Sequence, residues 1–231
     1  MRSESEKPLK NGGWLHKDPA GQPYRPAPRP EPPAPPVDCV RMLAGWTTPA
    51  GAIVGHAEEL GVDPLALVHL GAKWAPEFEA WAFPMFDGAG AVVGIRLRRP
   101  AGDKFAVKGG RAGLFLAPSL PAQPILFVCE GPTDTAAALT LGLYAAGRPS
   151  CLGCHAEVIQ TAKRTRCRQV VIVADADEPG QRGAEKLQAA LPVQSIIYTP
   201  PCKDLRAAVA AGLDAADIAR AISQMRWTVP K

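Results

Sequence analysis

Three short hydrophobic runs in the second half of the chain each end abruptly at charged or turn-forming residues. The runs occupy 125–129, 170–174 and 195–199 and consist mainly of apolar residues. A continuous apolar run of this length predicts a strand that is buried on both faces. The pattern therefore predicts a parallel sheet whose strands are joined and covered by helices.

Charged residues follow these predicted strands directly. Glu130 ends the first run, Asp175 and Asp177 follow the second, and Lys203 and Asp204 lie just beyond the third. Chemistry in open parallel sheets collects outside the carboxyl ends of the strands, so we expect these side chains to meet at one edge. Alternation along an extended backbone would point both aspartates to the same side. Such carboxylates favour an oxygen-liganded cation such as Mg2+, and the alternative is that an aspartate caps the following helix.

Two helices are predicted around these strands. One runs from about 135 to 143, with Thr133 or Asp134 capping its start. The other runs from 214 to about 225 and carries an apolar face that includes Ile218.

The first half of the chain begins with a helical pattern over residues 37–73. Within it, Asp63 and Pro64 predict the start of a new helix after a turn at Gly61. Helical hairpins of this shape are usually scaffolding, and this one carries few Lys or Arg residues. We therefore interpret it as a packing element rather than as a DNA-reading helix-turn-helix.

A β-hairpin is predicted next. Residues 81–87 and 92–99 flank a glycine-containing turn at 88–90, and residues 104–108 add a third strand.

Basic residues concentrate on this hairpin. From Arg96 to Arg111 the chain has six Lys or Arg residues and one Asp. Because Arg96 and Arg98 alternate with apolar residues, one face of the strand is predicted to be basic while the other meets the core. A solvated basic face without a ligand is the alternative.

Composition limits the class of protein. With 231 residues and a net charge of +4, the chain is long enough for one or two small domains and is mildly basic, which permits contact with nucleic acid. No apolar stretch approaches the roughly 18 residues of a membrane span, and the first residues lack the apolar core of a secretion signal, so we expect a cytoplasmic protein. Cys151 and Cys154 have the spacing of one ligand pair, but a zinc site needs a second pair and the other four cysteines are isolated, so all six are interpreted as reduced thiols.

The charged motifs resemble those of a known family. Glu130-Gly131-x-x-Asp134, then Asp175-x-Asp177-x-x-Gly180, then Lys203-Asp204-Leu205 are similar, in order and spacing, to the Toprim domain. That domain is shared by bacterial and phage primases, topoisomerases and some nucleases. The resemblance covers roughly residues 123–212, and the Lys-Asp-Leu tail is similar to that of the primase-type members.

The resemblance implies an α/β fold in which a Toprim domain, a parallel sheet flanked by helices, follows a small α+β basic subdomain. The segment around Cys151 would then be an inner strand of the sheet. The predicted domain boundaries are a disordered proline-rich tail or linker over 1–36, a primase-like amino-terminal subdomain over 37–122, the Toprim domain over 123–212, and a carboxy-terminal helix and tail over 213–231. Nine of the 25 prolines fall between Pro19 and Pro36, which is typical of an extended linker.

The function that the resemblance implies is that of a DNA primase-like enzyme in replication. It would be a metal-dependent nucleotidyltransferase that makes RNA primers on single-stranded DNA. Mg2+ or Mn2+ would be held by the three catalytic carboxylates Glu130, Asp175 and Asp177. Lys203 and Asp204 would bind nucleotide.

The basic residues of the hairpin would contact nucleic acid through its phosphates. These residues are Arg96, Arg98, Lys104, Lys108 and Arg111. The expected partners are a single-stranded DNA template, NTPs and a replicative helicase on a separate chain, without a membrane.

Two other functions fit the same motifs. A Toprim nuclease would cut phosphodiesters with the same carboxylates, but such nucleases usually accompany an ATPase, and the chain has no Gly-x-x-x-x-Gly-Lys-Ser/Thr loop. A non-catalytic DNA-binding Toprim protein would keep the fold for assembly, and three intact acidic positions argue against it.

Overall fold

A computed structural model describes most of the chain, namely residues 7–8, 14–15, 35–49 and 51–230. The chain divides into two units, 1–33 and 34–231. In the first unit, β1 (Lys7–Pro8) and β2 (Trp14–Leu15) form an antiparallel pair. Most of the predicted proline-rich linker lies outside the described residues.

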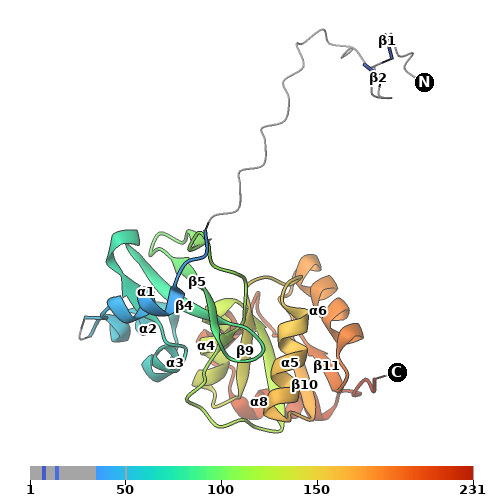
Figure 1. Cartoon of the computed structure of the whole chain (residues 1–231). Coiled ribbons are helices and arrows are strands. Elements are labelled where there is room, and N and C mark those ends of the chain that lie inside the picture. Colours follow the sequence, from blue (N-terminus) through green and yellow to red (C-terminus); the bar gives the residue numbers. More distant parts are fainter. Residues whose placement is uncertain (1–6, 9–13, 16–34, 50, 231) are drawn as a thin grey trace. The chain divides into compact units, whose positions relative to one another are not determined.

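The second unit contains two sheets (Figure 1). The four-stranded sheet is antiparallel and has the order β3 (Lys73–Ala75), β4 (Ala80–Phe86), β5 (Val92–Arg98), β6 (Lys104–Ala106). The five-stranded sheet has the order β11 (Gln194–Tyr198), β10 (Gln169–Val173), β8 (Ile125–Glu130), β9 (Ala145–Arg148), β7 (Phe115–Leu116). Its strands are parallel except for β7, which pairs antiparallel with β9.

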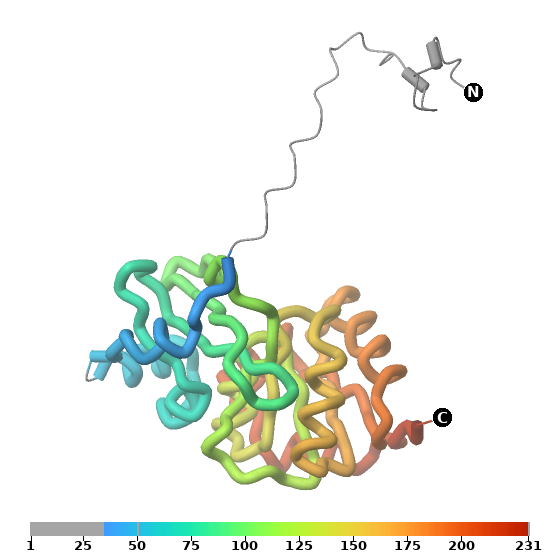
Figure 2. Tube along the Cα trace, in the orientation of Figure 1, coloured from blue at the N-terminus to red at the C-terminus, as the bar shows by residue number. Residues whose placement is uncertain are grey.

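Helices precede the first sheet and alternate with the strands of the second. They are α1 (Cys39–Gly45), α2 (Ala52–Leu60), α3 (Pro64–His69), α4 (Gly131–Thr140), α5 (His155–Thr165), α6 (Glu178–Ala190), α7 (Leu205–Ala210) and α8 (Ala215–Ser223), with a short 3-10 turn η1 (Pro76–Phe78). Figure 2 shows the blue and green first half of this unit beside the yellow-to-red second half. Within the described residues, no helix combines the length and apolar character that a membrane span requires.

The parallel sheet is buried on both faces, as the continuous apolar runs predict. Along β8, Phe127 and Cys129 join one hydrophobic core, while Leu126 and Val128 join the other. The first core is covered by α4, α7 and α8, and the second by α5 and α6. Successive side chains of a strand point to opposite faces, so only a run that is apolar at every position satisfies both cores.

The predicted helical hairpin is confirmed as a packing element. Gly61 ends α2 in the left-handed conformation, and the side chain of Asp63 accepts a hydrogen bond from the backbone N–H of Leu65 at the start of α3. Leu67 is fully buried in the first core, which also contains Phe83 of the antiparallel sheet. This shared core joins the two sheets into one unit.

Two local predictions are wrong. The segment around Cys151 is a turn rather than a strand, because the strand is β9 and ends at Arg148. Helix α4 begins at Gly131, four residues earlier than predicted, so neither Thr133 nor Asp134 caps it. The early start requires α4 to approach β9 closely, and Gly147 permits this, since a Cβ at that position would overlap the Thr135 hydroxyl.

Candidate active site

A cleft of about 380 Å3 opens where the two sheets meet. It is lined by charged residues from both sheets and from the turns after the parallel strands, together with a few small or apolar residues. The lining consists of Arg96, Arg98, Lys104, Phe115, Glu130, Gly131, Pro132, Thr133, Asp134, Pro149, Asp175, Lys203, Asp204 and Arg206.

The acidic wall of the cleft is built from the carboxyl ends of parallel strands. Glu130 is the last residue of β8, and Asp175 follows the end of β10 at Val173. The two strands are neighbours, with Val128 opposite Ile172. This register brings both carboxylates to one edge of the sheet, where Asp204 joins them after β11. Of the residues expected to meet at this edge, the structure brings together Glu130, Asp175, Lys203 and Asp204.

The carboxylates of this wall are costly to ionise together. Burial, followed by the neighbouring charges of Asp134 and Glu130, raises the pKa of Asp175 to about 7. Burial likewise raises the pKa of Asp134 to about 6, and that of Glu130 above its usual range. Grouped carboxylates with raised pKa values are typical of functional sites.

A buried arginine lies beside Glu130. Arg148 is the last residue of β9, stands opposite Glu130 in the parallel register, and is only 2 % exposed. Its guanidinium donates to the carbonyl oxygen of Cys151, so it also holds the turn after β9. Although burial dominates the pKa of Glu130, the positive charge of Arg148 and the backbone N–H of Cys151 act in the opposite direction and favour the carboxylate. Sequence reasoning missed Arg148, because it lies in a short Ala-Ala-Gly-Arg strand without a motif.

Two acidic side chains hold the start of α7. Asp204 is its N-cap and accepts a hydrogen bond from the backbone N–H of Ala207 at 2.7 Å. Asp134, which was expected to cap α4, instead accepts from the backbone N–H of Arg206 at 2.9 Å. Helix α4 therefore ties the first acidic motif to the Lys-Asp-Leu motif. Arg206 lines the cleft. Its position directly after the Lys-Asp-Leu motif was the sequence signal that could have identified it.

The basic wall of the cleft comes from the antiparallel sheet. Arg96 and Arg98 lie on the same face of β5, and Lys104 lies opposite Arg98 on β6. Arg96 also donates to the carbonyl oxygen of Pro149 at 3.0 Å, which bridges the two sheets. Burial, together with the nearby charge of Arg206, lowers the pKa of Arg98. The predicted basic face of the strand is confirmed, and it faces the acidic wall.

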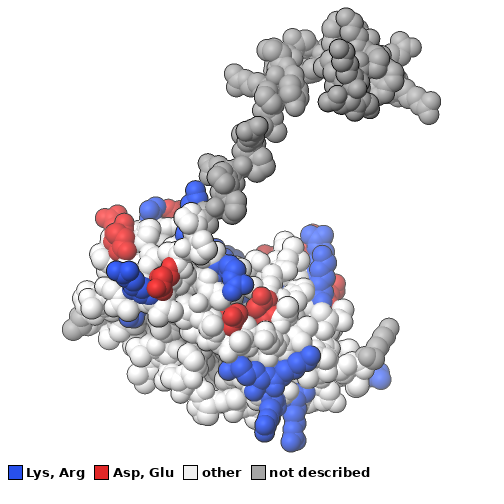
Figure 3. Space-filling model, in the orientation of Figure 1, with Lys and Arg blue, Asp and Glu red and all other residues white. Residues whose placement is uncertain are grey.

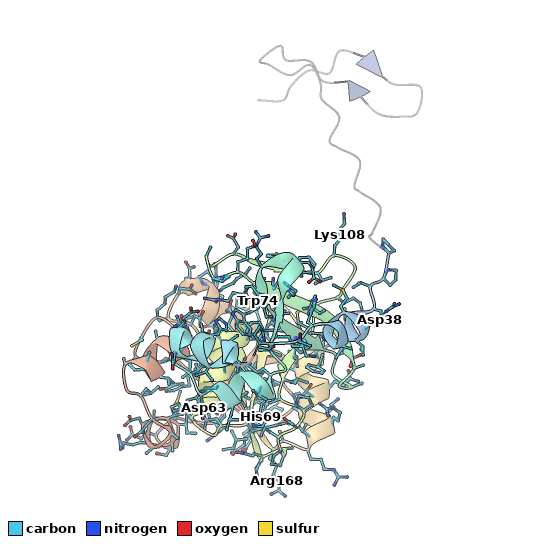
Figure 4. All side chains as sticks on the ribbon, turned by 90° about the vertical axis from the view of Figure 1, so that its left-hand side faces the viewer. Asp38, Asp63, His69, Trp74, Lys108 and Arg168 are labelled. Atoms are coloured by element: carbon cyan, nitrogen blue, oxygen red, sulfur yellow. The ribbon has the colours of Figure 1, made fainter. Side chains whose placement is uncertain are left out.

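Three predicted site residues do not line the cleft. Asp177 is the N-cap of α6, and its Oδ1 accepts from the backbone N–H of Gly180 at 2.8 Å. The capping interpretation is therefore correct for Asp177, although its charge still acts on Glu130 and Asp175. Lys108 and Arg111 lie outside the lining, and Figure 4 shows Lys108 extending from one end of the molecule.

The cleft supplies oxygen donors, which is the chemistry that Mg2+ and Mn2+ prefer. In the part of the chain that the structure describes, no three His, Cys, Asp or Glu side chains are arranged as a ready-made metal site. A protein usually contributes one or two carboxylates to Mg2+, with water and substrate phosphates completing the shell. The two strand-end carboxylates Glu130 and Asp175 fit that requirement.

The second half of the chain matches a known family model. The match covers residues 127–209 and belongs to the Toprim-like family. The chain contains a Toprim domain. No curated protein matches the sequence of the chain.

Solved structures agree with the fold. A DnaG catalytic core has a TM-score of 0.62 at 18 % identity, with 80 % of this chain and 76 % of that chain covered. The E. coli primase catalytic core has a TM-score of 0.62 at 17 % identity, covering 80 % and 77 %. The primase fragment of the bacteriophage T7 primase-helicase has a TM-score of 0.57 at 16 % identity, covering 71 % and 72 %. The chain therefore has the fold of a primase catalytic core, in which a Toprim domain follows a small basic subdomain along the sequence.

Proposed function

We propose that this protein is a primase-like nucleotidyltransferase that synthesises RNA primers on single-stranded DNA during replication. The observation that carries the proposal is the two-walled cleft. Carboxylates at the strand ends of the Toprim domain face Arg96, Arg98 and Lys104 across a space of about 380 Å3. A nucleotide triphosphate and a template backbone both need cations around their phosphates, while the transfer reaction needs carboxylates at its centre.

The reaction joins a primer 3′-hydroxyl oxygen to the α-phosphorus of an incoming nucleotide and breaks its bond to pyrophosphate. Glu130 is proposed to take the proton of the hydroxyl or to hold metal, since it is a strand-end carboxylate with a raised pKa. Arg148 holds the turn beside Glu130 from behind the cleft. Lys203 lies in the lining and is proposed to steady the triphosphate as a compact positive charge, next to Asp204.

The residues proposed to hold Mg2+ or Mn2+ are Glu130, Asp175 and Asp177. A bound metal would supply charge neutralisation at the reacting phosphate and would make the hydroxyl easier to deprotonate. Asp177 differs from the other two because one of its oxygens already caps α6. Its other oxygen remains for this role.

The proposed partners follow from the same cleft. Arg98 and Lys104 are proposed to contact the phosphates of a DNA template, and Arg96 adds its charge while bridging to Pro149. One of the similar structures is a DnaG primase catalytic domain bound to single-stranded DNA, and another is the primase part of a primase-helicase. We propose a replicative helicase as a protein partner and the cytoplasm as the compartment.

Extension of a supplied RNA primer on single-stranded DNA, with NTPs and Mg2+, tests this function. The wild-type protein should extend the primer, and Glu130→Gln should lose about 10²- to 10⁴-fold in rate because the amide cannot accept a proton. Glu185→Gln is the matched control, since Glu185 is an exposed residue of α6 outside the cleft.

Two results would replace the proposal. Degradation of the DNA with Mg2+, without extension, would identify the chain as a Toprim nuclease. Tight DNA binding without either reaction, even with a helicase added, would identify a non-catalytic binding protein. The fold of Glu130→Gln is checked by thermal unfolding, so that a folded but inactive variant is distinguished from an unfolded one.

A further inference from the structure

A second concentration of positive charge lies at the opposite end of the Toprim sheet from the cleft. The last turn of α5 and the segment before β10 carry Lys163, Arg164, Arg166 and Arg168, which we call the α5 basic patch. All four residues are exposed. Figure 3 shows a dense group of Lys and Arg side chains over the lower end of α5.

The topology separates this patch from the cleft. Helix α5 leaves the carboxyl edge of the sheet after β9 and returns to the amino edge, where β10 begins at Gln169. The backbone N–H of Arg168 donates to the carbonyl oxygen of Pro124, just before β8, which anchors the patch at that edge. Strand β10 has five residues, so the two ends of the sheet are about 16 Å apart along the strand. Figure 4 shows Arg168 at one end of the molecule and Lys108 at the other.

The charges of the patch are not neutralised by neighbouring acids. Among the described residues, none of the four forms an ion pair with a carboxylate. Arg164 donates through Nε to the carbonyl oxygen of Gly88 at 3.1 Å, so its position is held by the turn between β4 and β5. Four exposed cations within six residues, without carboxylate partners, form a surface suited to a polyanion.

A cavity of about 350 Å3 adjoins the patch. Its lining includes Arg164 and Arg166, together with Tyr144 and the apolar Leu116 and Leu120. Proteins that bind single-stranded nucleic acid combine cations for the backbone with an aromatic and apolar surface for an unstacked base. The cavity and the patch together provide both parts.

The surface around the patch favours nucleic acid over a protein partner. Protein interfaces are centred on an apolar, fully buried core. In the described ranges, the exposed large hydrophobic side chains all lie elsewhere: Val40, Val54, Leu65, Val68, Leu152 and Val229. A patch that offers only cations and one aromatic-lined cavity matches a phosphate backbone better than an acidic protein.

We propose that the α5 basic patch is a second binding site for single-stranded nucleic acid, separate from the cleft. Lys163, Arg166 and Arg168 contact the phosphates, and the cavity beside Tyr144 receives a base. A strand held at both ends of the Toprim sheet is retained while the cleft moves along it. The inference goes beyond the proposed function and does not require catalysis.

Binding of a fluorescein-labelled oligothymidylate, followed by fluorescence anisotropy in chelator and without NTPs, tests the second site. The background is Arg98→Ala with Lys104→Ala, which removes cations of the cleft but keeps the Arg96 bridge to Pro149. Adding Lys163→Ala, Arg166→Ala and Arg168→Ala should weaken the remaining binding about tenfold or more. It should also reduce the salt slope of log K by about 2, as expected for three lost phosphate contacts to a single strand.

The matched control in the same background is Arg182→Ala with Lys186→Ala and Arg226→Ala. It removes the same charge from exposed positions outside the patch. Arg164 is kept in every variant because it holds the Gly88 turn, and thermal unfolding checks that each variant is folded. If the patch and control variants bind equally well, the second site is refuted.

Photo-crosslinking gives an independent readout. An oligonucleotide with iododeoxyuridine should crosslink to Tyr144 itself, located by fragmentation of the peptide, and the patch substitutions should remove that crosslink. Crosslinks confined to the cleft would overturn the proposal. Binding of polyglutamate at the patch, without competition by oligothymidylate, would assign the surface to an acidic protein instead. Because metal and NTPs are absent, failure of primer extension in the same preparation does not affect these outcomes.

Discussion

The two sheets that form the cleft supply their charges in opposite ways. In the antiparallel sheet, Arg96 and Arg98 lie within a strand, on the face opposite to the buried Ile95 and Leu97. In the parallel sheet, no charge interrupts β10, and Asp175 is reached only after the strand has ended. An antiparallel sheet can expose one face along its whole length, whereas a parallel sheet covered on both sides can place polar groups only at its ends. The basic wall of the cleft therefore extends along a strand, whereas the acidic wall is confined to strand ends.

Because the acidic wall is confined to the strand ends, it should be the side more sensitive to substitution. Asp175, which lines the cleft, and Asp177, which caps α6, separate the effect of charge from that of capping. Asp175→Asn should slow primer extension by about 10²- to 10⁴-fold, because it removes a carboxylate from the lining of the cleft. Asp177→Asn should also reduce activity while leaving thermal stability unchanged, since an amide caps a helix nearly as well as a carboxylate. Calorimetric titration with Mn2+ should show weaker binding for both.

Asp177→Ala is the control for the cap itself. It should lower the unfolding free energy by about 1 kcal/mol, because the backbone N–H of Gly180 loses its acceptor. Full activity and unchanged Mn2+ affinity in Asp177→Asn would restrict this residue to capping α6.

Substitution of Arg148 tests whether the acidic wall depends on a buried residue that positions Glu130 and the turn after β9. Arg148→Met keeps the apolar length of the side chain but removes the donor to the carbonyl oxygen of Cys151. We expect kcat to fall by about 10- to 100-fold with little change in KM for NTP, by analogy with the loss of groups that orient a ligand. Arg148→Lys should restore part of the activity, since it returns a donor and a positive charge beside Glu130.

A purely structural role for Arg148 would give a different pattern. Urea unfolding should then show equal destabilisation of both variants, without a selective effect on kcat. Recovery of stability but not of kcat in Arg148→Lys would also contradict the positioning role.

The basic wall should tolerate substitutions better than the acidic wall, because its charge is spread over several residues of a sheet face. Arg98→Ala with Lys104→Ala should weaken single-stranded DNA binding and reduce the salt slope of log K by between about 1 and 2, the amount expected for two phosphate contacts. Arg182→Ala with Lys186→Ala on α6 is the charge-matched control. Equal slopes in the two double variants would show that the basic face of β5 is only solvated.

The smallest expected effect concerns packing of the antiparallel sheet. His56 of α2 is buried and stacks on Trp81 of β4, with ring centroids 4.4 Å apart. Burial lowers the pKa of His56, although its hydrogen bond with Glu59 acts in the opposite direction. The folded protein therefore resists protonation of this ring. The associated stability is present above the unfolded-state pKa of about 6.5 and is lost as the pH falls below it.

Urea unfolding between pH 7.5 and 5.5 measures this effect. His56→Phe should retain the stacking and lose part of the acid sensitivity, while His69→Gln, at a partly exposed position, serves as control. If wild type and His56→Phe lose stability in parallel as the pH falls, another group is responsible.

The sequence identified the elements whose pattern is strictly local. The runs at 125–129 and 170–174 predicted β8 and β10, and alternation in β5 predicted a basic face. Asp63 with Pro64 predicted the start of α3. The start of α4 was not predictable in this way. It depends on the close fit of Gly147 in β9 against Thr135 in α4, and these two residues belong to different elements.

The sequence by itself determined which residues are charged at the ends of buried strands, since apolar runs cannot contain them without leaving an ionised group in a core. Only the tertiary structure decided which of those residues line the cleft and which hold helix ends. It assigned one Asp177 oxygen to a helix cap, turned Asp134 towards the N–H of Arg206, and placed Arg148 beside Glu130. Each outcome depends on the register between strands and on contacts between residues that are far apart in the sequence. Packing of the whole core sets these contacts, and no local pattern encodes them.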